Sequence, residues 1–137
     1  MIPNVRVAVR IRPLSPEQQS ILSPSSDANS IKCLGVKGKQ GNKEAIFTFD
    51  HVYGTDKTQQ DLYNETAAPM LQNFLDGYNV TIMAYGQTGS GKTFTIGTAD
   101  TDNAKDPSIQ GILPRFIDDL FEHIKKQRLA STIEVSF

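Results

Sequence analysis

The chain opens with a strict alternation of apolar and polar positions over residues 4–12. The apolar side of this pattern consists of Val5, Val7, Val9 and Ile11. A period of two residues is typical of a strand that buries one face. Pro13 follows and removes a backbone donor, so the sequence predicts that the strand ends there.

The next part of the chain carries two short apolar runs after a polar segment. Residues 15–30 are rich in Ser and Pro and have no periodicity, which predicts a surface loop. The apolar runs cover residues 31–36 and 45–49, and the turn-type residues 37–42 separate them. This order predicts a β-hairpin.

Residues 58–77 have the pattern of an amphipathic helix. Thr58 and Asp61 have the spacing of a capping box at its start. The apolar stripe consists of Leu62, Thr66, Met70, Leu71, Phe74 and Leu75. Pro69 lies inside the pattern and is expected to kink or split the helix, and Gly77 suits its C-terminal cap.

The second half of the chain alternates apolar runs with polar stretches. Residues 80–85 form a short apolar run that predicts a central strand, buried on both faces as in a parallel sheet. Residues 97–110 are polar and predict an exposed insertion, whereas residues 112–124 carry apolar side chains at helical spacing. Residues 132–137 alternate again, so we expect another strand that continues past Phe137 and a chain that is a fragment of a domain.

A glycine-rich loop directly follows the predicted central strand. Its residues are Gly86, Gln87, Thr88, Gly89, Ser90, Gly91, Lys92 and Thr93. The glycines let the backbone curl around an anion, with successive N–H groups directed at a phosphate. Lys92 would place an ammonium near the β- and γ-phosphates, and Thr93 would offer its hydroxyl to Mg²⁺. A strand before the loop and a helix after it are the context that this motif requires, so the sequence predicts a nucleoside triphosphate site.

The loop alone does not identify the class of enzyme, because kinases, GTPases, transporter ATPases and motors all use it. A small phosphate-loop kinase would need an acceptor site and a lid, and neither is evident in the sequence. Guanine selection by an Asn-Lys-x-Asp element is not indicated, because residues 103–106 carry those residue types in another order.

Composition narrows the range of partners and settings. Lys and Arg number 14 against 15 Asp and Glu, so no global field attracts nucleic acid or an anionic membrane. The apolar stretches are too short to span a bilayer, and the N-terminus has no signal-peptide pattern. The single cysteine, Cys33, suits a reducing intracellular setting, and His51 and His123 are too isolated for a metal site.

Four segments along the chain carry further signature residues. They are Val9-Arg10-Ile11-Arg12-Pro13, then Phe47-Thr48-Phe49-Asp50-His51-Val52-Tyr53, then residues 77–93 with the glycine-rich loop, and finally Gly111-Ile112-Leu113-Pro114-Arg115. In this order they resemble the kinesin motor domain. The length of the insertion at residues 97–110, together with the Gly89-Ser90 pair, is similar to the kinesin-4-like group. The whole chain, residues 1–137, is therefore interpreted as the N-terminal, nucleotide-binding part of a kinesin-like motor domain.

The resemblance implies a fold, an activity and a partner. The fold would be that of the α/β P-loop NTPases, a central mostly parallel sheet with helices on both faces, here incomplete at the C-terminus. The activity would be a microtubule-stimulated ATPase that uses ATP and Mg²⁺, releases ADP and drives movement along microtubules in the cytoplasm. The resemblance also implies that Arg10 and Pro13 flank the adenine and that Phe94 packs against it. The alternatives are a solvated strand arginine and a core aromatic.

Two elements that kinesins use for hydrolysis do not occur in these residues. They are switch I, Asn-x-x-Ser-Ser-Arg, and switch II, Asp-x-x-Gly. Phosphoryl transfer needs a positioned water and charge stabilisation beyond the loop lysine and the metal. Hydrolysis and contact with microtubules are therefore expected to depend mainly on regions outside this chain. The alternative is a kinesin-like fragment that binds nucleotide without turnover.

Overall fold

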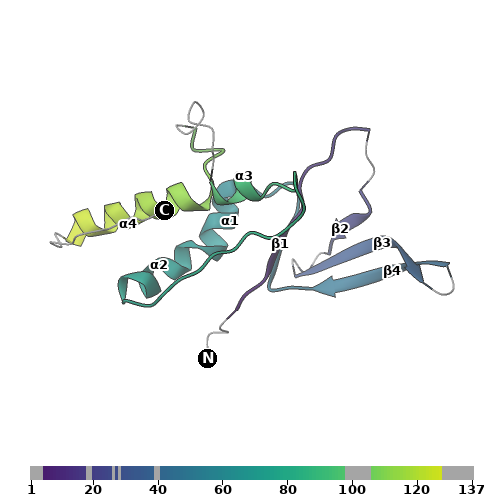
Figure 1. Cartoon of the computed structure of the whole chain (residues 1–137), viewed down its shortest axis with the longest axis horizontal. Coiled ribbons are helices and arrows are strands. Elements are labelled where there is room, and N and C mark those ends of the chain that lie inside the picture. The colour runs from purple at the N-terminus through teal and green to yellow at the C-terminus, as the bar shows by residue number, and fades with distance from the viewer. Residues whose placement is uncertain are drawn as a thin grey trace. The chain divides into compact units, whose positions relative to one another are not determined.

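The computed structural model describes residues 5–17, 20–25, 27, 29–38, 41–97 and 106–127, without the side chains of residues 36–38, 41–43 and 127. Within the chain, contacts group the residues into two compact units, Met1–Lys57 and Thr58–Phe137. Figure 1 labels the helices and most of the strands.

The first unit contains two small sheets. In one, β1 (Ala8–Arg10) pairs in parallel with β5 (His51–Tyr53). In the other, the order is β2-β3-β4, formed by Leu22–Pro24, Ser30–Gly38 and Gly41–Thr48, and both pairings are antiparallel. The hairpin of β3 and β4 confirms the prediction from the two apolar runs.

Two predictions for the first unit were wrong. The first strand is limited to three residues, and Val5 and Val7 are exposed, Val5 by 75%. Strand β2 lies within the segment that was predicted to be only a loop, because its pairing with β3 supplies the hydrogen bonds that its sequence does not signal. Among the described residues of this unit, the buried apolar ones are Ile31, Val52 and Tyr53.

The second unit begins with two short helices, α1 (Gln59–Thr66) and α2 (Ala68–Leu75). The capping box is confirmed, since the Asp61 N–H donates to Thr58 Oγ1 at 3.1 Å and the Thr58 N–H donates to Asp61 Oδ2 at 2.9 Å. Pro69 splits the predicted helix as expected and lies in the first turn of α2, where a missing N–H costs no helical bond.

The end of α2 also follows the sequence. Gly77 has a φ of 88°, and its N–H donates to Phe74 O at 3.1 Å. The Tyr78 N–H donates to Asn73 O at 3.0 Å. These two bonds form a Schellman motif, which needs the left-handed conformation that glycine adopts readily.

The predicted strand at residues 80–85 is not formed. No ladder is described for this segment, and Met83 and Tyr85 are 83% and 98% exposed rather than buried. A strand requires a neighbour that accepts and donates its backbone hydrogen bonds, and none of the pairings among the described residues includes residues 80–85. The prediction of burial on both faces is therefore wrong for the described structure.

Helix α4 (Ile112–Gln127) confirms the helical spacing predicted for residues 112–124. It lies against α1 and α2, as Figure 1 shows, and buries Ile112 and Leu120. A third helix, α3 (Lys92–Ile96), follows the glycine-rich loop. The predicted strand at residues 132–137 and most of the predicted insertion lie outside the described residues.

One polar contact joins α1 to α4. Tyr63, which is buried, donates its hydroxyl to Asp119 Oδ2 at 2.5 Å. Burial, with the hydrogen bond to Asp119 as the next cause, raises the pKa of Tyr63 well above its ordinary value. Because the pKa is higher in the folded state, this group contributes stability that is complete below about pH 10 and is lost above it.

Tyr63→Phe is expected to lower the free energy of unfolding by about 1.5 kcal/mol at neutral pH, because Asp119 loses its donor. Above about pH 10 the wild-type chain loses stability faster than the variant, since only the wild type can ionise at this position on unfolding. Urea unfolding at several pH values measures both effects. Tyr78→Phe makes the same change at an exposed tyrosine and should leave both unchanged; equal pH slopes in wild type and Tyr63→Phe would contradict the assignment.

Candidate phosphate-binding site

Backbone conformation shapes the glycine-rich loop. Gly86, Gly89 and Gly91 have φ values of 154°, 78° and 101°. Side-chain-bearing residues rarely adopt these conformations, so the three glycines predicted to curl the backbone are the ones that do so. The Ser90 N–H donates to Gln87 O at 3.1 Å and closes a turn inside the loop.

Gly86 is required for a second reason. A Cβ built at this position would lie 2.6 Å from Ser90 Oγ and 3.3 Å from Ser90 Cβ. At Gly91, by contrast, a Cβ would meet nothing within 4 Å, so only its φ favours glycine. At Gly86, therefore, both the backbone conformation and the approach of Ser90 oppose a side chain.

Lys92 lies at the start of α3 and reaches back over the loop. Its Nζ donates to Gly86 O at 2.8 Å and to Gln87 O at 2.9 Å. The ammonium is thereby held beside the loop whose N–H groups can bind an anion. A backbone nest with an adjacent fixed cation fits a phosphate group.

Thr93 follows and is exposed. Its hydroxyl is of the type that completes a Mg²⁺ site shared with phosphate oxygens and water. Within the described ranges, no three His, Cys, Asp or Glu side chains cluster as metal ligands. Thr93 is therefore a residue of this loop that could hold a magnesium ion together with phosphate oxygens.

The far end of α3 is fixed by two residues that the sequence did not single out for this role. Gln59, at the start of α1, donates from Nε2 to Phe94 O at 2.6 Å and to Ile109 O at 3.1 Å. Gly111 lies so close to α3 that a Cβ there would be 2.6 Å from the nitrogen of Gly97. In the sequence, Gln59 lies inside the capping-box segment and Gly111 inside a family signature. Neither pattern indicates that these residues contact the backbone at the end of α3.

The segment before α4 is held by Arg115. Its Nε donates to Gln110 O at 3.0 Å, and its two Nη groups donate to Gln60 Oε1 and Pro107 O. Arg115 thus ties the start of α4 both to α1 and to the chain that precedes it. This connection keeps residues 107–111 beside the end of α3.

The three residues predicted to contact adenine are placed as follows. Phe94 lies in α3, next to Thr93, and its side chain is 46% exposed. Arg10 and Pro13 belong to the other unit. Burial lowers the pKa of Arg10, but a guanidinium remains protonated at physiological pH. The structure brings the loop residues and Phe94 together, and the adenine role of Arg10 and Pro13 stays a prediction.

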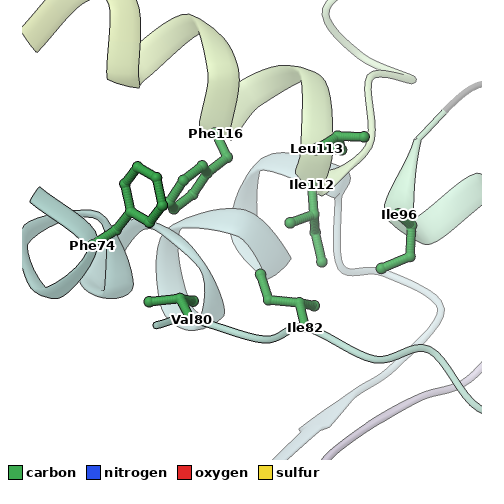
Figure 2. Close-up of a pocket in the computed structure, with 7 residues that line it drawn as sticks. All are labelled: Phe74, Val80, Ile82, Ile96, Ile112, Leu113 and Phe116. Carbon is green, nitrogen blue, oxygen red and sulfur yellow. The ribbon is translucent and has the colours of Figure 1, made fainter. Parts of the chain in front are cut away.

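An apolar groove of about 250 Å³ lies in the same unit (Figure 2). It is lined by Phe74, Val80, Ile82, Ile96, Ile112, Leu113 and Phe116. Phe74 and Phe116 meet edge to face with ring centroids 5.9 Å apart. None of the seven side chains carries a hydrogen-bonding group, so this groove does not suit a phosphate.

Among the described helices, none has the length and hydropathy that crossing a bilayer requires.

Comparison with known proteins places the chain in a family. The model of the kinesin motor domain matches residues 10–137. The chain belongs to the kinesin motor-domain family. Among curated relatives, it is 39% identical to kinesin-like protein KIN-5A of Arabidopsis thaliana over 98% of this chain and 13% of the relative. It is 38% identical to the chromosome-associated kinesin KIF4 of Xenopus laevis over 90% of this chain and 10% of the relative.

Solved kinesin structures confirm the predicted fold class. The Drosophila kinesin Kin10/NOD, solved with manganese and ADP, matches with a TM-score of 0.75 and 32% identity, covering 93% of this chain and 40% of that one. A fast kinesin matches with a TM-score of 0.75 and 29% identity, covering 95% of this chain and 35% of that one. The chain therefore spans well under half of each of these solved motors. Relatives named KIN-5A and KIN-4A are equally identical to it, at 39%, so the kinesin-4-like subgroup stays a prediction.

Gly86→Ala is expected to weaken binding of inorganic pyrophosphate at least tenfold, because both the φ of 154° and the contact with Ser90 Oγ oppose a side chain. Isothermal titration calorimetry measures the dissociation constant. The double variant Gly86→Ala/Ser90→Ala should recover part of the affinity, because it removes the 2.6 Å contact with Oγ and leaves the backbone strain and the 3.3 Å approach to the Cβ of residue 90.

Gly77→Ala is the matched control for this test. Gly77 also has a positive φ with open space around it, but it caps α2 rather than shaping the loop. It should lower stability and leave the dissociation constant unchanged. If the two single variants weaken pyrophosphate binding equally, the loop geometry is not what governs the affinity.

Proposed function

We propose that this chain is the nucleotide-binding part of an ATP-driven microtubule motor. The single observation that carries the proposal is the loop in which Lys92 is fixed over Gly86 and Gln87. It is supported by membership of the kinesin motor-domain family, whose model matches residues 10–137. The cofactors would be ATP or ADP with Mg²⁺.

Different residues of the loop would bind the phosphates and the metal ion. The backbone N–H groups of residues 86–91 and the Lys92 ammonium would bind and orient the β- and γ-phosphates. Thr93 would hold the magnesium ion, which neutralises the charge that develops on the phosphates. The Drosophila Kin10/NOD motor was solved with ADP and a divalent metal, manganese, which supports this choice of ligand.

The base would be held by a different set of side chains. Phe94 extends from the helix that carries Lys92 and Thr93, and its ring is accessible for packing. Arg10 and Pro13 would complete the adenine site, because a guanidinium and a pyrrolidine ring both pack well against a flat base. This assignment rests on the resemblance of residues 9–13 to the family's first-strand signature.

The chain would form the N-terminal part of a longer motor domain, with the switch elements and the main microtubule-binding region elsewhere. Two observations support this arrangement. The chain covers 40% of the Kin10/NOD motor, and its segment 80–85 leaves Met83 and Tyr85 exposed where a sheet neighbour would cover them. A map of a NOD–microtubule complex into which NOD and tubulin were docked supports microtubules as the partner and the cytoskeleton as the site of action. The cytoplasm would be the compartment.

The decisive experiment measures ATP hydrolysis with and without microtubules, in the 137-residue chain and in a chain extended past Phe137. The extended chain should hydrolyse ATP faster with microtubules, and the short chain should bind ADP without turnover, because water positioning needs the switch elements. Lys92→Ala should abolish binding in both. Turnover by the short chain would contradict the dependence on other regions. The absence of ATP hydrolysis in both chains would favour the alternative, a kinesin-like nucleotide-binding fragment without catalysis.

A second test distinguishes residues that bind the adenine base from residues that bind the phosphates. Phe94→Ala should weaken ADP binding about tenfold and leave pyrophosphate binding unchanged, because only the base would pack on the ring. Titration calorimetry with the two ligands gives both constants. Phe74→Ala, an exposed aromatic of the apolar groove, is the control and should change neither. Equal losses for both ligands in Phe94→Ala would contradict the adenine role.

A further inference from the structure

Gln59 is a buried polar side chain at the first position of α1. It is 3% exposed, and its Nε2 donates to two backbone carbonyls, those of Phe94 and Ile109. A buried amide is costly unless it is hydrogen-bonded. The position of Gln59 is therefore tied to those two partners, which lie 35 and 50 residues further along the chain.

The chemistry of these contacts is specific to an amide. Both partners are carbonyl oxygens, which only accept hydrogen bonds, so the nitrogen end of the amide must face them. A methionine of similar size would leave both carbonyls without this donor. A glutamate would place an ionised oxygen against them, and a carboxylate cannot donate.

One of the two carbonyls belongs to a helix that cannot stabilise itself. Helix α3 has five residues, far fewer than an isolated helix needs. The carbonyls of its last turn have few partners within the helix, and Gln59 supplies a donor to the one at Phe94. At the same end, the backbone of Gly111 lies so close to Ile96 and Gly97 that no Cβ would fit between them. The direction of α3 is thus set by α1 and by residues 109–111.

We propose that Gln59 is a positioning residue of the nucleotide site, an inference that rests on the proposed function. By fixing the Phe94 carbonyl, it fixes the helix whose first two residues are Lys92 and Thr93. The ammonium and the hydroxyl then face the phosphates and the metal in one orientation. Without the Gln59 donor, the end of α3 is released and the nucleotide binds more weakly.

The rest of the unit keeps its own connections when Gln59 is changed. Tyr63 still bonds to Asp119, and Arg115 still bonds to Gln60, so α1 stays joined to α4. The effect of a Gln59 variant should therefore be confined to α3 and the residues it carries. This separates positioning from a general loss of fold.

The first test is the dissociation constant of fluorescent mant-ADP for Gln59→Glu, measured against pH in the 137-residue chain. At pH 8 the carboxylate faces two carbonyls, and binding should be about tenfold weaker than in the wild type. Burial and the two carbonyls raise the pKa of a glutamate at this position. As the pH falls, the protonated carboxyl regains one donor, and the affinity should recover toward that of the wild type.

Gln60→Glu is the matched control, since it makes the same change at the next residue of α1, which is exposed. Gln60 Oε1 accepts from Arg115, and a carboxylate at this position accepts from the guanidinium as well, so the variant keeps that bond. Its affinity for mant-ADP should equal that of the wild type at every pH. Wild-type affinity of Gln59→Glu at pH 8, or a loss that does not recover at low pH, would overturn the proposal.

The second test needs no nucleotide. Amide hydrogen exchange should show at least tenfold faster exchange at Thr95 and Gly97, whose N–H groups bond to Gly91 and Thr93, in Gln59→Glu at pH 8. Exchange in α1 and α4 should be unchanged. Unchanged protection in α3, or equal loss in all helices, would overturn the proposal. If the wild-type chain fails to bind mant-ADP, the proposed function falls, and this exchange result still decides whether Gln59 fixes α3.

Discussion

Close backbone contact between Gly111 and the Ile96–Gly97 peptide is the constraint that decides where α3 ends. A Cβ at Gly111 would lie within 2.7 Å of three backbone atoms there, so the two segments meet without any side chain between them. The contact brings the residues before α4 against the helix that follows the phosphate loop. Gln59 can bond to Phe94 and Ile109 at once only because these segments are adjacent. The end of α3, the start of α1 and the segment before α4 thereby share one small region of contact.

This arrangement explains how a five-residue helix can carry a binding site. A helix of that length has no stability of its own, and its geometry must come from its surroundings. At its start, Gly91 takes a left-handed φ of 101° that turns the chain from the loop into the helix. At its end, Gln59 and Gly111 supply the bonds and the steric limit. Lys92 and Thr93 lie between these two fixed ends, which restricts the orientations that they can adopt.

Local signals in the sequence predicted the parts of the fold that depend on neighbouring residues. The capping box of Thr58 and Asp61, the break at Pro69 and the turn at Gly77 each act within a few residues, and all three were correct. The parallel pairing of β1 with β5 was not predicted, because it joins residues more than 40 positions apart.

The wrong prediction of a strand at residues 80–85 has a related cause, because strand formation depends on a pairing partner that lies far away in the sequence. Its apolar pattern is that of a buried strand, but a strand forms only when another chain segment accepts its hydrogen bonds. The described structure offers no such partner, and Tyr85 stays almost fully exposed. Likewise the glycine-rich loop was predicted as a phosphate site from its own residues, whereas the support from Gln59 could be seen only in three dimensions.

The electrostatics of the loop also come from local geometry rather than from the whole chain, whose net charge is −1. Lys92 donates to two neutral carbonyls, so its side chain has already lost much of the rotamer freedom that binding would otherwise remove. A phosphate oxygen is a stronger acceptor than a neutral carbonyl, because the bond is charge-assisted on both sides. Exchange of one acceptor for the other then releases free energy without reordering the side chain. The carbonyls of Gly86 and Gln87 therefore hold the Lys92 ammonium in place before the anion binds. Their hydrogen bonds are weaker than those to a phosphate oxygen, so the anion can replace them.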